Sequence, residues 1–155
     1  LSFLPHLASQ HLTIAETGSW KGRSTKAMLD TGALVTAIDH WQGCQEIKEL
    51  TDNKDIYSEF MDNVGRYENL RVIKMSSDEA HANLNGDRFD MVFIDGSHDY
   101  EQVKRDIENW TPRAKKVICG HDYSDTWPDV IRAVSEKFER VNVVDSIWYV
   151  NLQEA

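Results

Sequence analysis

The sequence predicts an α/β fold, a single domain with a mostly parallel sheet and helices on both faces. Two observations support this prediction. Apolar segments of strand length alternate with segments of helical period along most of the chain. Near the start, a short apolar run leads into an acidic residue, a turn with two glycines and a helical segment, which is the first unit of a nucleotide-binding sheet. A chain of 155 residues can bury one such core, so residues 1–155 are assigned to one domain.

The expected elements follow in chain order. A short helix or cap is expected within residues 1–10, before a first strand at 12–15. Strands that are covered on both faces are nearly all apolar, as 33–39 and 89–95 are. Further strands are expected at 70–75, 116–119, 141–144 and 146–150, and helices at 23–29, 56–64, 77–85, 100–110 and 128–138. The last two strands are joined by a tight connection, so the final strand is expected to be antiparallel.

Charge and composition argue against several classes of function. The formal net charge is -9, and the longest basic cluster is Lys115-Lys116, so neither nucleic acid nor an anionic membrane is an expected partner. No apolar run approaches the roughly 20 residues of a transmembrane helix, and residues 1–7 do not resemble a signal peptide. Cys44 and Cys119 form no disulfide framework, and Cys119 is expected as an apolar filler of a buried strand. A cytoplasmic protein is therefore expected. The chain starts as though inside a domain, so it could be a piece of a longer protein.

The glycine turn has the pattern E-x-G-x-x-x-G, made by Glu16, Gly18 and Gly22, with Ser19 between the glycines. Glycine lets the backbone take positive φ and lets a ligand approach closely. The helix start beyond it offers free N–H groups to an anion. The four-residue spacing departs from the G-x-G-x-x-G pattern of NAD-binding proteins, and alone it fits a purely structural turn equally well. The pattern resembles motif I of the class I S-adenosylmethionine (AdoMet) methyltransferases.

Polar residues follow five consecutive predicted strands. In an open parallel sheet ligands bind at the carboxyl ends of the strands, so these residues are expected to share one site. Asp39 ends the second strand, 21 residues after Gly18, where a carboxylate in a Rossmann-like sheet accepts hydrogen bonds from ribose hydroxyls. A solvated aspartate at a strand end is the alternative. The other groups are Ser76-Ser77, Asp95 to Asp99 and Gly120 to Tyr123.

The ends of the fourth and fifth strands carry the residues expected to do chemistry. Adjacent strands lie about 4.8 Å apart, so Asp95 and Asp122 can converge, and two close carboxylates favour a proton or a cation between them. Mg²⁺ or Mn²⁺ fits such a site, and a nitrogen ligand from His121 would favour a transition metal. Asp122 as a turn cap and Asp95 bonded to backbone N–H groups is the alternative. His98 lies three residues beyond Asp95 and is a candidate base for a hydroxyl proton, or a structural histidine.

Two further motifs extend the resemblance. F-I-D-G-S-H-D-Y and the later G-H-D-Y are similar to a methyltransferase group that includes metal-dependent sugar O-methyltransferases. Membership implies a seven-stranded sheet of order 3-2-1-4-5-7-6, with Asp95 and Asp122 as metal ligands and His98 as base. His121 departs from that group, which has an acid at this position, and this leaves metal use and metal identity open.

The resemblance also implies how AdoMet would be held. Glu16 and the turn at Gly18 would receive its amino-acid end and Asp39 its ribose. Ser76 and Ser77 would meet the adenine edge together with Trp41 or His40, although a core role for Trp41 is equally expected. Asp95 is expected both to contact the cofactor and to bind the metal.

The expected function is methylation of a small hydroxylated acceptor, which could be a sugar. Two alternatives stay open, a non-catalytic binding module with this fold and an NAD(P)-binding oxidoreductase. The short chain has little room for a substrate lid, so a homo-oligomer could complete the acceptor pocket.

Overall fold

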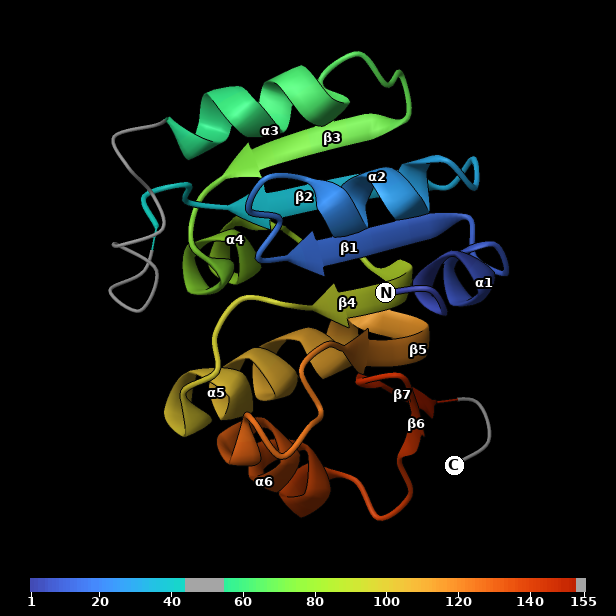
Figure 1. The fold of residues 1–155 in the computed structure, drawn as a ribbon, viewed down its shortest axis with the longest axis vertical. Helices are drawn as coiled ribbons and strands as arrows, with labels where there is room; N and C mark the ends of the chain where they lie inside the picture. Colours follow the sequence, from blue (N-terminus) through green and yellow to red (C-terminus); the bar gives the residue numbers. More distant parts are fainter. Residues whose placement is uncertain (44–54, 153–155) are drawn as a thin grey trace.

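The centre of the fold is a seven-stranded sheet of order β3-β2-β1-β4-β5-β7-β6, seen in a computed structural model that describes residues 1–43 and 55–152 (Figure 1). β7 is antiparallel to both of its neighbours, and the other neighbouring pairs are parallel. The predicted strand order and the predicted antiparallel strand are confirmed. The strands are β1 (Thr13–Thr17), β2 (Leu34–Asp39), β3 (Leu70–Lys74), β4 (Phe89–Ile94), β5 (Ala114–Gly120), β6 (Asn142–Val144) and β7 (Ile147–Asn151).

Helices cover both faces of this sheet (Figure 1). Their bounds are α1 (Leu4–Ala8), α2 (Arg23–Leu29), α3 (Ile56–Val64), α4 (Ser77–Asn83), α5 (Tyr100–Trp110), the 3₁₀ turn η2 (Thr111–Arg113) and α6 (Pro128–Lys137). The first three helices pack on one face and α4, α5 and α6 on the other. Within residues 1–43 and 55–152, no helix combines the length and apolar character needed to cross a membrane.

The two faces of the sheet are built from alternate strand residues. Ile14 and Phe93 belong to the core beneath α1, α2 and α3, whereas Ala15 and Ile94 belong to the core beneath α4, α5 and α6. Successive side chains of a strand point to opposite faces, so a strand buried on both sides is apolar at most positions. All six residues of β4 are buried, as its largely apolar sequence predicted, and the one acid among them, Asp90, accepts from the Leu12 backbone N–H at 3.0 Å.

Several smaller expectations can be compared directly. Cys119 is fully buried in β5, as predicted, and its thiol donates to the Val92 carbonyl at 3.2 Å. Ile56, Phe60 and Val64 form the buried stripe expected of α3. Cys44 and the start of the polar stretch that follows Gly43 lie outside the described residues.

The strand register aligns three of the predicted site segments at one level. Thr17 pairs with Ile94, and Ile94 pairs with Gly120. The residues that follow these three strand ends are Gly18, Asp95 and His121. Backbone bonds continue the ladder through them, because Asp95 N donates to Thr17 O (2.9 Å) and His121 N donates to Ile94 O (3.1 Å). The polar strand ends therefore meet at one edge of the sheet.

Candidate active site

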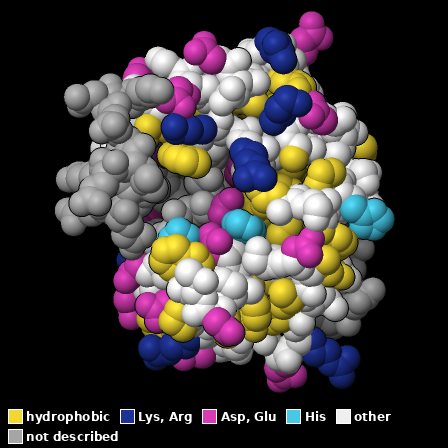
Figure 2. Space-filling model, viewed as in Figure 1, with side chains coloured by type: hydrophobic (Ala, Val, Ile, Leu, Met, Phe, Trp, Pro, Cys, Tyr) yellow, Lys and Arg dark blue, Asp and Glu magenta, His cyan; other side chains and the backbone are white. Residues whose placement is uncertain are grey.

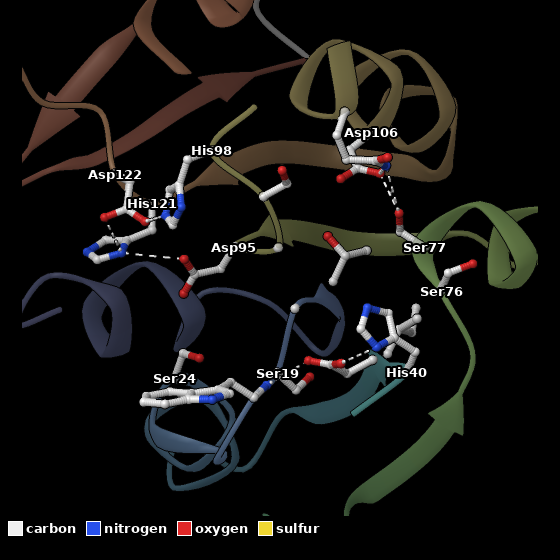
Figure 3. Close-up of a pocket in the computed structure, with 18 of the residues that line it drawn as sticks. Ser19, Ser24, His40, Ser76, Ser77, Asp95, His98, Asp106, His121 and Asp122 are labelled. Atoms are coloured by element: carbon white, nitrogen blue, oxygen red, sulfur yellow. Dashed lines mark hydrogen bonds and ion pairs between the residues drawn. The ribbon is translucent and has the colours of Figure 1, made fainter. Parts of the chain in front are cut away.

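A cavity of about 680 Å³ opens at this edge. Its size lies within the range of small-molecule sites. The residues that follow β1, β2, β4 and β5, and the start of α4, contribute to its lining. In the space-filling view, acidic and histidine side chains gather near the middle of the face shown (Figure 2). The close-up shows Asp95, His98, His121 and Asp122 at one end and Ser77 with Asp106 at the other (Figure 3).

The glycine turn forms one wall of the cavity. Gly18 has φ +83°, and a Cβ there would lie 2.3 Å from the Asp95 carbonyl oxygen and 2.4 Å from the Gly96 Cα. Only glycine allows the turn to pack this closely on the end of β4. Gly22 also has φ +83°, but its Cβ position faces Phe60 and Val64 of α3, and it does not line the cavity. Gly18 therefore shapes the cavity wall, and Gly22 lets α3 pack against the start of α2.

Glu16 lies behind the turn and is fully buried. Its two carboxylate oxygens accept hydrogen bonds from Ser24 Oγ and Thr25 Oγ1, each at 2.5 Å. Burial raises the pKa of Glu16 to about 7, although the two hydroxyls oppose this shift. Glu16 is not among the residues that line the cavity, whereas Ser19 and Ser24 are. The structure thus gives Glu16 a role in joining β1 to the first turn of α2, and direct contact with a cofactor stays a prediction.

Asp39 stands at the end of β2 and lines the cavity. Its Oδ2 accepts from the Trp20 backbone N–H at 2.9 Å, and its Oδ1 accepts from the Trp41 backbone N–H at 2.7 Å. These bonds fix the orientation of the carboxylate, and each oxygen keeps acceptor capacity for a ligand. His40 also lines the cavity, and its Nδ1 accepts from the Gln42 backbone N–H at 2.9 Å.

Trp41 has the core role that the sequence left open. It is 6% exposed and packs against Tyr57 and Phe60, with ring centroids 5.1 and 4.7 Å away. Its Nε1 donates to the Trp20 carbonyl at 2.7 Å. Trp41 also lines the cavity. Its bond to the Trp20 carbonyl supports the glycine turn.

The start of α4 forms the opposite wall. Ser76 is the N-cap residue and forms a capping box with Glu79, which explains why the helix begins here. Ser77 Oγ donates to Asp106 Oδ1 of α5 at 2.5 Å. Ser76, Ser77 and Asp106 all line the cavity.

Asp95, His121 and Asp122 form a compact cluster at the ends of β4 and β5. Each offers one ligand atom, and these atoms lie within 4.8 Å of one another. His121 Nδ1 lies 3.2 Å from Asp122 Oδ1 and 3.4 Å from Asp95 Oδ1. Its Nε2 lies 3.1 Å from Ser146 Oγ, which comes from the turn between β6 and β7.

The charges of this cluster depend on one another. Hydrogen bonds with Asp122 and Asp95 raise the pKa of His121 to about 9. Burial raises the pKa of Asp95. Burial also opposes ionisation of Asp122, but hydrogen bonds with His121 and His98 outweigh it and hold the pKa of Asp122 well below its usual range. A protonated imidazole between the two carboxylates thus offsets one of the two negative charges that they carry when both are ionised.

His98 is held from two sides. Its Nε2 lies 2.8 Å from Asp122 Oδ2, the oxygen that does not face His121. Its ring stacks on Trp127, with centroids 3.7 Å apart and planes 12° apart. Trp127 is the N-cap residue of α6 and lines the same cavity. The ring of His98 therefore has a defined position next to the cluster.

The cavity gathers most of the predicted site residues. Those that line it are Gly18, Ser19, Asp39, His40, Trp41, Ser76, Ser77, Asp95, His98, His121 and Asp122. Glu16 and Gly22 lie behind it. Trp127 and Asp106 are among the lining residues that sequence reasoning missed. Asp106 had a visible signal, because an acid between Val103 and Ile107 falls on the apolar face of its helix.

The strand order and the site at the carboxyl edge define the fold class as that of the class I AdoMet-dependent methyltransferases, and the resemblance predicted from sequence is confirmed. A family model described as a methyltransferase domain matches residues 15–123. The chain belongs to this methyltransferase family.

Solved structures with this fold include several methyltransferases. Cofactor-bound Rv0187 from MTB has a TM-score of 0.70 and 19% identity, covering 99% of this chain and 79% of that chain. The O-methyltransferase from Bacillus cereus in complex with SAH has a TM-score of 0.67 and 18% identity, covering 96% and 79%. The N-methyltransferase NodS from Bradyrhizobium japonicum has a TM-score of 0.67 and 11% identity, covering 97% and 92%. At these identities the likeness establishes the fold alone, and it includes both O- and N-methyltransferases.

One curated relative is the uncharacterized protein y4gI of Sinorhizobium fredii. It is 30% identical over 89 residues, which are 56% of this chain and 10% of that protein. The chain therefore spans about a tenth of the length of this relative.

Proposed function

We propose that this chain is an AdoMet-dependent methyltransferase that acts on a hydroxyl group of a small molecule. One observation carries the proposal. A single cavity joins the carboxylate of Asp39 to the cluster of Asp95, His121 and Asp122 and to His98. A nucleoside-type ligand and a site for proton transfer would thus share one space.

The cavity residues fit AdoMet. Asp39 has the position and acceptor capacity for ribose hydroxyls. Gly18 lets the turn pack closely on the end of β4, which keeps the backbone of the turn at the cavity wall. Ser76 and His40 line the side expected for adenine. When bound, AdoMet would supply a methyl group on an activated sulfonium, so positioning provides much of the rate enhancement.

His98 is the proposed base for the acceptor hydroxyl. Asp122 Oδ2 lies 2.8 Å from its Nε2, so the carboxylate would orient the ring and stabilise the positive charge that the ring gains with the proton. Trp127 limits rotation of the same ring by stacking. Asp122 would thus orient His98 through one oxygen and contact His121 through the other.

The donor set of the cluster fits a divalent transition metal such as Mn²⁺ better than Mg²⁺, because it includes an imidazole nitrogen. Asp95, His121 and Asp122 would hold the ion, consistent with their ligand atoms lying within 4.8 Å of one another. A bound cation would lower the pKa of a coordinated hydroxyl. Binding would require His121 to lose the proton that it shares with the two carboxylates.

The proposed acceptor is small and hydroxylated, with a sugar as one example. The net charge of -9 favours such a molecule over a nucleic acid. We also propose a cytoplasmic location, which agrees with the buried free thiol of Cys119. A homo-oligomer that completes the acceptor pocket remains part of the proposal.

Calorimetry tests the cofactor assignment. AdoMet and S-adenosylhomocysteine should bind and NADH should not, because the glycine turn differs from the NAD pattern. Absence of binding by both sulfur compounds would refute the proposal. Methyl transfer from labelled AdoMet to a panel of sugars, catechols and amines then separates an O-methyltransferase from an N-methyltransferase. Cofactor binding without transfer to any hydroxyl compound would favour a non-catalytic module.

A further inference from the structure

Asp106 is a buried carboxylate at the cavity wall that the proposed chemistry does not use. It lies on α5, is 2% exposed and lines the cavity. Its two hydrogen bonds within the described part of the chain come from Ser77 Oγ at 2.5 Å and Gln102 Nε2 at 3.0 Å, and both reach Oδ1. No ion pair within residues 1–43 and 55–152 neutralises it.

A buried carboxylate with only neutral partners is costly to ionise. Burial accordingly raises the pKa of Asp106 to about 6, against the two hydrogen bonds. An amide or a hydroxyl could join α4 to α5 without this cost, so a purely structural link does not require an acid. Perturbed carboxylates in a cleft are candidates for ligand recognition.

The second oxygen of Asp106, Oδ2, accepts neither of these two hydrogen bonds. Oδ2 lies 3.9 Å from the Cβ position of Gly96, and Gly96 follows Asp95 in the lining. Gly96 has no side chain, so nothing from this residue stands between that oxygen and the space above the end of β4. Figure 3 shows Asp106 and Ser77 at the end of the cavity opposite His121 and Asp122.

The position along the cavity indicates which part of a ligand this oxygen would meet. The reaction cluster occupies one end and the ribose carboxylate Asp39 lies on the β2 side, so the base of a nucleoside would extend toward α4. An ionised carboxylate only accepts hydrogen bonds. The 6-amino group of adenine donates them, whereas hypoxanthine has an accepting 6-oxo group at this position and carries its donor on the neighbouring ring atom N1.

We propose that Asp106 is the residue that selects the adenine base of the cofactor, by accepting a hydrogen bond from the exocyclic amine at Oδ2. This assignment rests on the proposed cofactor. Ser77 and Gln102 then act as positioning residues, because their bonds to Oδ1 leave Oδ2 directed at the ligand. The 6-oxo analogue binds more weakly because two acceptors, its carbonyl oxygen and Asp106 Oδ2, would face each other with no hydrogen between them.

Calorimetry at pH 7.5 with two matched pairs of ligands tests the assignment. The pairs are S-adenosylhomocysteine with S-inosylhomocysteine, and adenosine with inosine. The wild type should bind each adenine compound at least about ten-fold more tightly than its hypoxanthine partner, the expected size for a hydrogen bond to a charged group. Asp106→Asn should abolish or reverse the preference, because the two donors at the Oδ1 position hold the amide oxygen there, and the NH2 group at the Oδ2 position donates to a 6-oxo group and cannot accept from a 6-amino group.

Asp78→Asn is the matched control. Asp78 also lines the cavity, but its carboxylate is engaged by Arg105 and Asn109 at 3.1 Å each. This variant should keep the wild-type ratio. Equal affinity of the wild type for adenine and hypoxanthine compounds would overturn the assignment, even if the Asp106 variant does not fold. So would loss of the preference in the Asp78 variant alone.

The two ligand pairs separate this assignment from the proposed function. Preference for adenosine over inosine without binding of S-adenosylhomocysteine would refute the AdoMet proposal. It would still support Asp106 as the residue that selects adenine. Binding of S-adenosylhomocysteine without preference for the adenine compounds would support the AdoMet proposal and refute the role of Asp106 in selecting adenine. Uniform weakening of all four ligands by Asp106→Asn would reduce Asp106 to a structural residue.

Discussion

The imidazole of His98 lies flat on the indole of Trp127, with ring centroids 3.7 Å apart and an interplanar angle of 12°. Trp127 begins α6, so a helix on one face of the sheet fixes a ring above the carboxyl edge. We expect Trp127→Leu to lower kcat about three- to ten-fold, the range of an aromatic pair, with little change in affinity for S-adenosylhomocysteine. Trp127→Phe should restore most of kcat because a phenyl ring still stacks. Equal activity of the Leu and Phe variants would argue against the positioning role.

His98→Ala tests the base directly. Loss of general-base catalysis should lower turnover by about 10²- to 10⁴-fold and leave the affinity for AdoMet nearly unchanged. Steady-state assays with the acceptor found by the panel, together with calorimetry, separate the two effects. His6→Ala is the control, because His6 is an exposed histidine on α1 away from the cavity. A parallel fall in cofactor affinity would instead identify His98 as a structural residue.

Gly18 and Gly32 form a matched pair for the tight turn. Both have positive φ, +83° and +89°, but a Cβ at Gly18 would lie 2.3 Å from the Asp95 carbonyl, whereas nothing lies within 4 Å of one at Gly32. Gly32→Ala should lower the free energy of unfolding by about 1 kcal/mol, the cost of the backbone conformation alone. Gly18→Ala should cost about 1–3 kcal/mol more because the clash is with backbone. Urea unfolding measures both, and equal losses would contradict the close packing.

Glu16 predicts a specific dependence of stability on pH. Its pKa is about 7 in the folded protein against 4.5 as the reference value, because the side chain is buried. A raised pKa favours the protonated form, so its contribution to stability is complete below pH 4.5 and is lost as the pH rises through 7. The stability of the wild type relative to Glu16→Gln should therefore fall by up to about 3 kcal/mol across this interval.

Urea unfolding of both proteins from pH 4.5 to 8 measures this difference. Glu79 provides a control of opposite sign, since hydrogen bonds from Ser76 lower its pKa. The advantage of the wild type over Glu79→Gln should be lost only as the pH falls below 4.5, so this pair is also measured below that pH. A flat difference for Glu16→Gln would show that the carboxyl is not protonated on folding.

Metal use is tested by binding as well as by activity. Calorimetric titration with Mn²⁺ should show one site in the wild type and at least about ten-fold weaker binding in Asp95→Asn. Asp129→Asn, an exposed acid in the first turn of α6, is the control. Chelation by EDTA should abolish turnover and Mn²⁺ should restore it. Full activity after chelation would exclude the metal and leave the His121 imidazolium as the cation of the cluster.

The sequence predicted the sheet well because its signals are local. Strands that are buried on both faces leave largely apolar runs, and β4 illustrates this with five apolar residues among six buried ones. The polar groups at the strand ends were equally predictable. Asp39 is the last residue of β2, and Asp95 and His121 directly follow β4 and β5. Parallel topology then brings them to one edge without further information.

The internal arrangement of the site was less predictable because it depends on side-chain direction. Glu16 has the sequence position of a ligand-binding acid, yet the pleat turns it into the core, where Ser24 and Thr25 bind it. Trp127 reaches His98 from 29 positions later in the chain, a contact that no spacing rule encodes. His121 was expected as a metal ligand, and its close contacts with both carboxylates add the role of an internal cation.

The hairpin of β6 and β7 contributes to the site as well as to the sheet. Its turn residue Ser146 contacts His121 through Oγ, and its carbonyl accepts from the Tyr123 N–H at 3.0 Å. The segment by which the family is recognised stops at residue 123, before Trp127 and Ser146. A protein trimmed to that segment would lack α6, β6 and β7, and with them the contacts of Trp127 with His98 and of Ser146 with His121. The arrangement of the two histidines therefore depends on residues up to the end of β7, beyond the segment that the family model matches.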